Sequence, residues 1–394
     1  MKLTKNSRKI YLDSASATPT NSEVLKVMTK VMRDNFGNPG AIHELGVQSK
    51  NIVEGARKKV SSLLGAHTDE IIFTSGATEA NNLAILGLSD LEHIVTTNIE
   101  HASVLEVCKH LEKNKLASVT YVEVEENGIV DPLKIKKALR PETNLVSVMY
   151  ANNEIGTIQP IKEIAKLIRH HKKTNPNSKV LFHTDAAQAV NYLDINPSRL
   201  GVDMLTLGAG KIYGPKGVGV LYVKRGVGIS RILQGGDQES GRRAGTENIA
   251  GIVGLSEALE ITEKMKVKES VRLIKLRDYF VDKLLNSKTF KNYGIILNGD
   301  ERERLPNNIN ITIPKIPSDL LVVELGAHGI YVSEKSACKS GEKKSSHVVK
   351  AIRSGEIDGS LRFSLGRETT KKDIDDTLAV LAQILKKLEP WYLK

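Results

Sequence analysis

Short apolar runs alternate with amphipathic segments along the first two-thirds of the chain. Seven of these runs are predicted to be strands, at residues 70–74, 93–97, 118–124, 145–150, 179–184, 203–208 and 218–223. Strands that are buried on both faces of a parallel sheet have this near-continuous apolar character. The pattern therefore predicts an α/β fold with a mostly parallel, seven-stranded sheet.

The last two predicted strands are joined differently from the others. Only the segment AGKIYGPKG (209–217) separates them, and about ten residues are too few for a crossover helix. We expect these two strands to form a hairpin, which makes one strand antiparallel to the rest of the sheet.

The pattern changes after residue 253. Residues 253–287 are rich in Glu, Lys and Leu and are predicted to form one or two long helices that leave the large domain. Strands are expected near residues 308–313 and 360–365, and helices near residues 319–329, 347–353 and 370–388. We predict a large domain over residues 15–262 and a smaller α+β domain built from residues 1–14 and 263–394.

Composition and charge indicate a soluble globular enzyme. The chain has 394 residues, 40% hydrophobic and 26% charged, and no apolar run is long enough to span a membrane. No apolar signal-peptide core follows the basic first residues, so we expect a cytoplasmic protein with no membrane partner. The net charge of +11 comes from scattered lysines and arginines, without aromatic-interleaved basic motifs. We therefore expect a solvated surface rather than direct nucleic-acid binding.

The two cysteines of the chain lie in very different surroundings. Cys108 has apolar neighbours at helical spacing and is expected to be buried and inert, and no C-x-x-C metal pair is present. Cys338 lies in the polar stretch YVSEKSACKSGEKKSSHVV, residues 331–349. Free cysteine is normally among the most buried residue types, so this thiol suggests chemistry, although an inert surface cysteine is the alternative.

Ligands in open α/β sheets bind beyond the carboxyl ends of the strands. After the first predicted strand, SGATEANN turns directly into a helix, and the N–H groups of residues 76–78 suit a phosphate. His101 and Asn153 follow two further strands. Taken alone, a satisfied structural histidine and an ordinary turn asparagine explain these two residues equally well.

Two more strand ends carry charged residues. Asp185 follows an apolar strand, with Gln188 three residues on, and its carboxylate is either functional or the N-cap of a helix. Lys211 follows the strand at 203–208, where small residues leave room for a bulky group. An enclosed lysine with a lowered pKa is a nucleophile toward carbonyl groups, whereas Lys216 in the turn is expected to be a surface charge.

These strand-end residues together match the requirements of pyridoxal 5'-phosphate (PLP). This cofactor needs a lysine for its carbonyl group, a carboxylate for its pyridinium nitrogen and a helix start for its phosphate. The chain has no G-x-x-x-x-G-K-[ST] motif and no G-x-G-x-x-G between a strand and a helix. The pattern therefore favours PLP over a nucleotide.

At this point the sequence resembles the cysteine desulfurases of the NifS/IscS type, in the class V branch of the fold-type-I PLP enzymes. The matching stretches run nearly end to end and in order: YLDSASATP, FGNP, FTSGATEANNLAI, EHASV, NNEIG, HTDAAQ, KIYGPKG, AGTEN, SAC and RFSLGR. The resemblance implies a fold-type-I PLP-dependent transferase and a role for each matching residue.

For the cofactor, the resemblance implies that Lys211 holds PLP and that His101 stacks on its ring. The other implied contacts are Asp185 with the pyridine nitrogen, Gln188 with the phenolic oxygen, and Ala77 and Thr78 with the phosphate. Thr246, in AGTEN, would reach the phosphate of a neighbouring subunit, which implies a homodimer.

For the substrate, the resemblance implies that Asn153 and Arg362 orient L-cysteine, with the arginine on its carboxylate. Cys338 would take the sulfur as a persulfide and leave L-alanine, and Lys335 and Lys339 would favour its thiolate. The sulfur would pass to an acceptor protein such as an iron–sulfur scaffold, or serve tRNA thiolation. The long polar segment after Cys338 matches the members with a mobile cysteine loop.

Two positions depart from the family pattern, and two alternatives remain. Gly210 replaces the usual histidine before the cofactor lysine, and Gly208 replaces a serine that sometimes contacts the phosphate.

Another class V enzyme, a selenocysteine lyase or an aminotransferase, is the nearest alternative. A binding protein that kept the fold and lost the chemistry is the other alternative.

Overall fold

The computed structural model describes residues 8–334, 346–353 and 360–392. Its central sheet has seven strands in the order β2-β8-β7-β6-β5-β3-β4. The strands are β2 (Ile71–Thr74), β3 (His93–Thr97), β4 (Ser118–Val122), β5 (Thr143–Ser147), β6 (Leu181–Asp185), β7 (Met204–Gly208) and β8 (Gly219–Val223). All seven predicted strands are therefore confirmed.

The predicted hairpin is also present. β8 is antiparallel to β7 on one side and to β2 on the other, whereas the strands from β7 to β4 are mutually parallel. The hairpin brings Lys211 to the carboxyl end of β7. The strand predicted at 145–150 ends earlier, at Ser147, because the Met149 N–H donates to the Glu100 carboxylate (3.0 Å).

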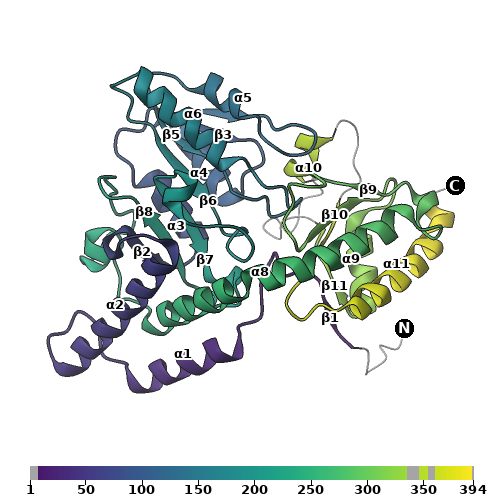
Figure 1. Cartoon of the computed structure of the whole chain (residues 1–394), viewed down its shortest axis with the longest axis horizontal. Helices are drawn as coiled ribbons and strands as arrows, with labels where there is room; N and C mark the ends of the chain where they lie inside the picture. Colours follow the sequence, from purple (N-terminus) through teal and green to yellow (C-terminus); the bar gives the residue numbers. More distant parts are fainter. Residues whose placement is uncertain (1–7, 335–345, 354–359, 393–394) are drawn as a thin grey trace.

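Helices cover both faces of this sheet (Figure 1). Alternate strand residues enter two apolar clusters, so that Ile71 and Phe73 face one layer and Ile72 faces the other. The helices on the first layer include α2 (Glu44–Leu64), α6 (Ile161–Thr174) and the start of α8 (Ile249–Asn286), and those on the second are α3 (Ala77–Leu86) and α4 (Ala102–Lys113). The remaining helices of this part are α1 (Ser22–Asp34), α5 (Pro132–Ala138) and α7 (Pro197–Leu200).

A smaller α+β unit has its own apolar cluster, which includes Ile10 and Leu12 and residues from Leu273 to Leu388. Its antiparallel sheet has the order β12-β10-β9, and β1 pairs with β11. These elements are β1 (Ile10–Tyr11), β9 (Ile296–Leu297), β10 (Asn308–Thr312), α9 (Ser318–Ala327), β11 (Ile330–Tyr331), β12 (Leu361–Ser364) and α11 (Lys371–Tyr392). The single helix α8 contributes to the cluster of the smaller unit and to the first layer on the central sheet, and it spans both units in Figure 1.

The short helix α10 (His347–Ile352) lies between β11 and β12 of the smaller unit in the chain but packs on the larger unit. Its Val348, Val349 and Ile352 belong to the cluster on the sheet. The division into domains at residues 15–262 and at residues 1–14 with 263–394 stays a prediction. In the part of the chain that is described, no helix is long and apolar enough to cross a membrane.

Candidate active site

A cavity of about 400 Å³ opens at the carboxyl ends of the central strands. All but two of the predicted site residues line it: Ala77, Thr78, His101, Asn153, Asp185, Gln188, Lys211 and Arg362. These residues come from six separate places: the start of α3, the segments after β3, β5 and β7, the end of β6 with the turn that follows it, and strand β12, so only the fold brings them together. Thr246 is exposed and does not line the cavity, and Cys338 lies outside the described residues.

One end of the cavity is the first turn of α3. The helix starts at Ala77 after Gly76, and the first turn of any helix carries N–H groups without intrahelical acceptors. Glu79 stabilises this turn, since its carboxylate accepts from Ser75 N (2.7 Å) and pairs with Arg243 (2.8 Å). The segment that carries Thr246 is thereby tied to the start of α3.

A hydrogen-bonded network connects Asp185 to His101. The Asn81 amide donates to Asp185 Oδ2 (2.7 Å) and to Ser103 Oγ (2.7 Å), and Ser103 Oγ lies 2.8 Å from His101 Nδ1. Asp185 Oδ1 accepts from Ala187 N (2.9 Å). The helix N-cap alternative for Asp185 is wrong, because the chain forms turns rather than a helix over residues 187–190.

Lys211 lies in a short 3-10 turn, Ala209–Lys211, directly after β7. Its ammonium group donates to the backbone oxygens of Ala15 (2.9 Å) and Ser16, and Gln188 Nε2 donates to the same Ala15 oxygen (2.9 Å). The N-terminal strap, which we define as residues 13–18, therefore forms one wall around the lysine. Asn191 Nδ2 donates to the Lys211 backbone oxygen (2.7 Å) and fixes the other side.

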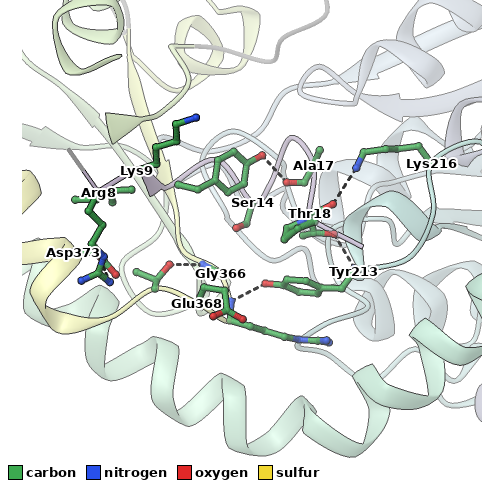
Figure 2. A pocket seen from close by; sticks show the side chains of 15 residues that line it. Arg8, Lys9, Ser14, Ala17, Thr18, Tyr213, Lys216, Gly366, Glu368 and Asp373 are labelled. Carbon is green, nitrogen blue, oxygen red and sulfur yellow. Dashed lines mark hydrogen bonds and ion pairs between the residues drawn. The ribbon is translucent and has the colours of Figure 1, made fainter. Parts of the chain in front are cut away.

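The strap also separates this cavity from a second one. Figure 2 shows the second cavity, of about 540 Å³, lined by Tyr11, Ser14, Ala17, Thr18 and Tyr213 among others. Ala17 and Lys216 line both cavities. Lys216 is exposed, as expected of a surface charge, and its ammonium group donates to the Thr18 backbone oxygen (3.1 Å) of the strap.

Arg362 enters the cavity from β12 of the smaller unit and is only 2% exposed. Its Nη2 donates to Asp13 Oδ1 (2.7 Å) and Ser16 Oγ (2.6 Å), and its Nη1 donates to the Asn153 backbone oxygen (2.8 Å). Its buried Nε has no partner among the described residues. A guanidinium held at both Nη atoms has a fixed orientation, as recognition of a carboxylate requires.

Sequence reasoning missed the residues that hold these side chains in place. Asn81 lies inside the quoted SGATEANN stretch, and its position one helical turn after Ala77 was the available signal. Ser103, Thr18 and Asp13 carried no such signal, because their contacts with Asn81, Gly210 and Arg362 are long-range in the sequence.

The chain was compared with known proteins. Residues 10–377 match the model of the family described as aminotransferase class-V. Cysteine desulfurase IscS of Dictyoglomus turgidum is 44% identical over 97% of this chain and 95% of its own length, and that of Methanosarcina thermophila is 43% identical over 96% and 92%. The chain belongs to the class V aminotransferase family.

Within this family the chain is of the cysteine desulfurase type, as its motifs predicted. A solved structure described as a NifS-like protein superposes with a TM-score of 0.88 and 34% identity, over 97% of this chain and all of the other. Another, SspA in complex with cysteine, has a TM-score of 0.75 and 32% identity over 91% and 99%. The predicted fold-type-I class is confirmed.

Class V enzymes of this type depend on PLP, and the cavity fits that cofactor. A lysine ammonium, a carboxylate whose Oδ2 is oriented by Asn81, and an open helix start line one space of suitable size. Gly208 lies where a Cβ atom would be 3.2 Å from Ala77 Cβ, so its lack of a side chain leaves room at the start of α3.

Proposed function

We propose that this protein is a PLP-dependent cysteine desulfurase that converts L-cysteine to L-alanine and takes the sulfur onto Cys338 as a persulfide. The observation that carries the proposal is the convergence of the predicted cofactor and substrate residues on one cavity. The cysteine desulfurase relatives at over 40% identity along nearly the whole chain support it.

The cofactor contacts follow from the positions of the side chains. Bound PLP supplies an electron-accepting ring that allows bonds at the substrate's carbon atoms to break heterolytically. Lys211 holds the cofactor's carbonyl carbon, and Asp185 pairs with the ring nitrogen. His101 lies against the ring, Gln188 reaches the phenolic oxygen, and the first turn of α3 with Ala77 and Thr78 binds the phosphate.

The substrate contacts involve both structural units. Arg362 binds the L-cysteine carboxylate, and Asn153 orients the substrate and the cofactor. The Asp13 carboxylate, 2.7 Å from Arg362, holds the guanidinium at the cavity wall. Ser16 and the Asn153 backbone oxygen complete this support, so the arginine has little freedom to follow a substrate of a different length.

Cys338 is proposed as the sulfur acceptor because Cys108 is unsuitable. Cys108 is fully buried beneath the sheet, and burial raises the pKa of its thiol to about 12. The Cys338 thiolate would form a bond to the substrate sulfur while the carbon–sulfur bond breaks. The electron pair of that bond would stay with the substrate carbon, which takes up a proton, so that the amino acid product is alanine. The persulfide then passes to an acceptor protein such as an iron–sulfur scaffold, or serves tRNA thiolation.

We further propose a cytoplasmic homodimer in which Thr246 reaches the partner's cofactor phosphate. An apolar surface on α1 and the segment before α2 supports this assembly. Met32 is 67% exposed, Phe36 74% and Ile42 98%. Large apolar side chains exposed within one short segment of the chain are typical of a protein–protein interface.

The test measures alanine formed from L-cysteine by the purified protein with PLP and a thiol reductant. Wild type is expected to form alanine, and Cys338→Ser and Lys211→Ala are expected not to. Alanine from Cys338→Ser would remove the role of the loop thiol. Activity on L-selenocysteine alone, or amino transfer to a keto acid, would favour the other class V activities, and a protein that stays colourless with PLP would favour a binding protein.

A further inference from the structure

The N-terminus of α10 contacts two turns that carry candidate active-site residues. Ser346 Oγ donates to Glu154 Oε2, and Glu154 directly follows Asn153. His347 Nε2 donates to the backbone oxygen of Glu100 (3.1 Å), and Glu100 directly precedes His101. Helix α10 thus connects the turn after β3 to the turn after β5.

The contact between Ser346 and Glu154 is shielded from water. Glu154 is 2% exposed and Ser346 is 7% exposed, so water cannot readily replace either partner. The Ser346 hydroxyl also accepts from Val348 N (3.1 Å) and Val349 N (3.2 Å), as the N-cap of α10. The Ser346 hydroxyl therefore caps α10 and also holds the side chain of Glu154 in the turn after β5.

Glu154 is fixed through its backbone as well as its side chain. Its N–H donates to Asn152 Oδ1 (2.8 Å), and its carbonyl oxygen accepts from Asn308 and Asn310 of β10, both at 3.1 Å. The neighbouring Asn153 carbonyl accepts from Arg362 Nη1 (2.8 Å). A displacement of Glu154 therefore moves an acceptor of the arginine that faces the substrate.

We propose that Ser346 and Glu154 are positioning residues for substrate binding. Their contact sets the position of Asn153, and through it the orientation of Arg362 toward the carboxylate of the amino acid substrate. His347 aligns the turn of His101 with the same helix. This inference rests on the proposed function, in which Asn153 and Arg362 hold the substrate.

Substitutions can separate the contact from the capping of α10. Ser346→Asp keeps a good N-cap but cannot donate to Glu154, and it brings two carboxyl groups together. The double variant Ser346→Asp with Glu154→Gln restores a hydrogen bond in the reverse direction, because the glutamine amide can donate. Ser346→Thr keeps both roles, and Lys350→Gln on the exposed face of α10 matches the change in net charge.

The experiment titrates L-alanine, the product without sulfur, into each PLP-loaded variant and follows the cofactor absorbance. We expect Ser346→Asp to bind L-alanine about tenfold more weakly. PLP content is expected to stay near wild type, because the phosphate end lies on α3. Tm is expected to fall in Ser346→Asp, since two carboxyl groups meet in a buried site, and to recover in the double variant. The double variant and Ser346→Thr are expected to recover most of the affinity, and Lys350→Gln to match wild type.

Two results would overturn the inference. One is unchanged L-alanine affinity in Ser346→Asp, and the other is a loss that accompanies lower PLP content and persists, together with a lower Tm, in the double variant. A wild type whose absorbance does not respond to L-alanine or L-cysteine would instead contradict the proposed function.

Discussion

Thr18 connects to the backbone on both sides of Lys211. Its hydroxyl donates to the Gly210 oxygen (3.1 Å) and accepts from Tyr213 N (2.8 Å). Tyr213 has a φ of 62°, which is unfavourable for a bulky residue and persists only where contacts enforce it. Arg367 supplies two more of these contacts, since its N–H donates to the Tyr213 hydroxyl (2.8 Å) and its guanidinium lies over the ring.

We expect Thr18→Val to loosen the turn of Lys211. The substitution keeps the shape but removes both hydrogen bonds, at a cost of about 1–3 kcal/mol. A lower Tm and faster loss of PLP during dialysis, followed by absorbance, are the expected results. Thr18→Ser keeps the hydroxyl and serves as the control, and equal PLP retention in both variants would contradict this role.

The Glu100 carboxyl makes the free energy of unfolding depend on pH. Burial, against the lowering effect of its hydrogen bonds with Met149 and Thr97, raises the pKa of this carboxyl from 4.5 to about 8. The folded protein therefore binds the proton more tightly than the unfolded chain does, and stability falls as the pH rises between these two values. We expect the Tm of wild type to drop by several degrees from about pH 5.5 to about pH 8.5, and that of Glu100→Gln to drop less. Equal slopes would contradict the assignment.

Among the elements, the start of α3 lies in close contact with the end of β7. A Cβ added to Gly208 would lie 3.2 Å from Ala77 Cβ, which requires α3 to move by a few tenths of an ångström. At Gly210 the nearest atom outside the adjacent residues, Lys216 Cγ, would be 3.5 Å away, an ordinary contact. Of the two departures from the family pattern, Gly208 is therefore the one that the packing requires.

We expect Gly208→Ala to raise the dissociation constant of PLP several-fold, because it displaces the turn that binds the phosphate. Fluorescence or absorbance titration of the apoprotein with PLP measures this effect. Gly210→Ala is the matched comparison and is expected to change PLP affinity less. A larger effect at Gly210 would show that the contact at Ala77 does not limit binding.

The elements were predictable from the sequence to the extent that local pattern decides them. The apolar runs located the central strands, and the short link 209–217 predicted the hairpin that holds Lys211. Long-range contacts decide the rest. β5 ends just before Met149, whose N–H donates to the Glu100 side chain. α10 packs on the distant larger core, and Asp185 is held by Asn81 rather than by a helix start.

At the scale of the whole molecule, the site draws on both structural units. Arg362 and Asp13 come from the smaller unit or its connection, whereas Lys211 and Asp185 follow strands of the central sheet. Helix α8 joins the two apolar clusters, and α10 returns from the smaller unit to the larger one. Relative movement of the two units would therefore change the distance between Arg362, which binds the substrate carboxylate, and the cofactor residues Lys211 and Asp185.

The proposed homodimer is tested at the exposed apolar surface. Phe36→Asp and Ile42→Asp would place carboxylates in the middle of the interface, so we expect the mass measured by light scattering after gel filtration to halve. PLP retention is expected to fall with it, as it would in Thr246→Ala. Trp391→Asp, at an 81% exposed position on α11, is the control and is expected to keep the wild-type mass. A wild type that is already monomeric would contradict the assembly.

The burial of Cys108 has a practical consequence for following sulfur. With that thiol sealed inside the protein, mild alkylation of the native chain reports on Cys338 alone, and alkylation after denaturation counts both cysteines. The alkylation measured after denaturation is the internal reference for the alkylation of the native protein in the same sample. Intact-mass spectrometry of the native reaction can therefore record the occupancy of the sulfur carrier over time without a cysteine-free background variant.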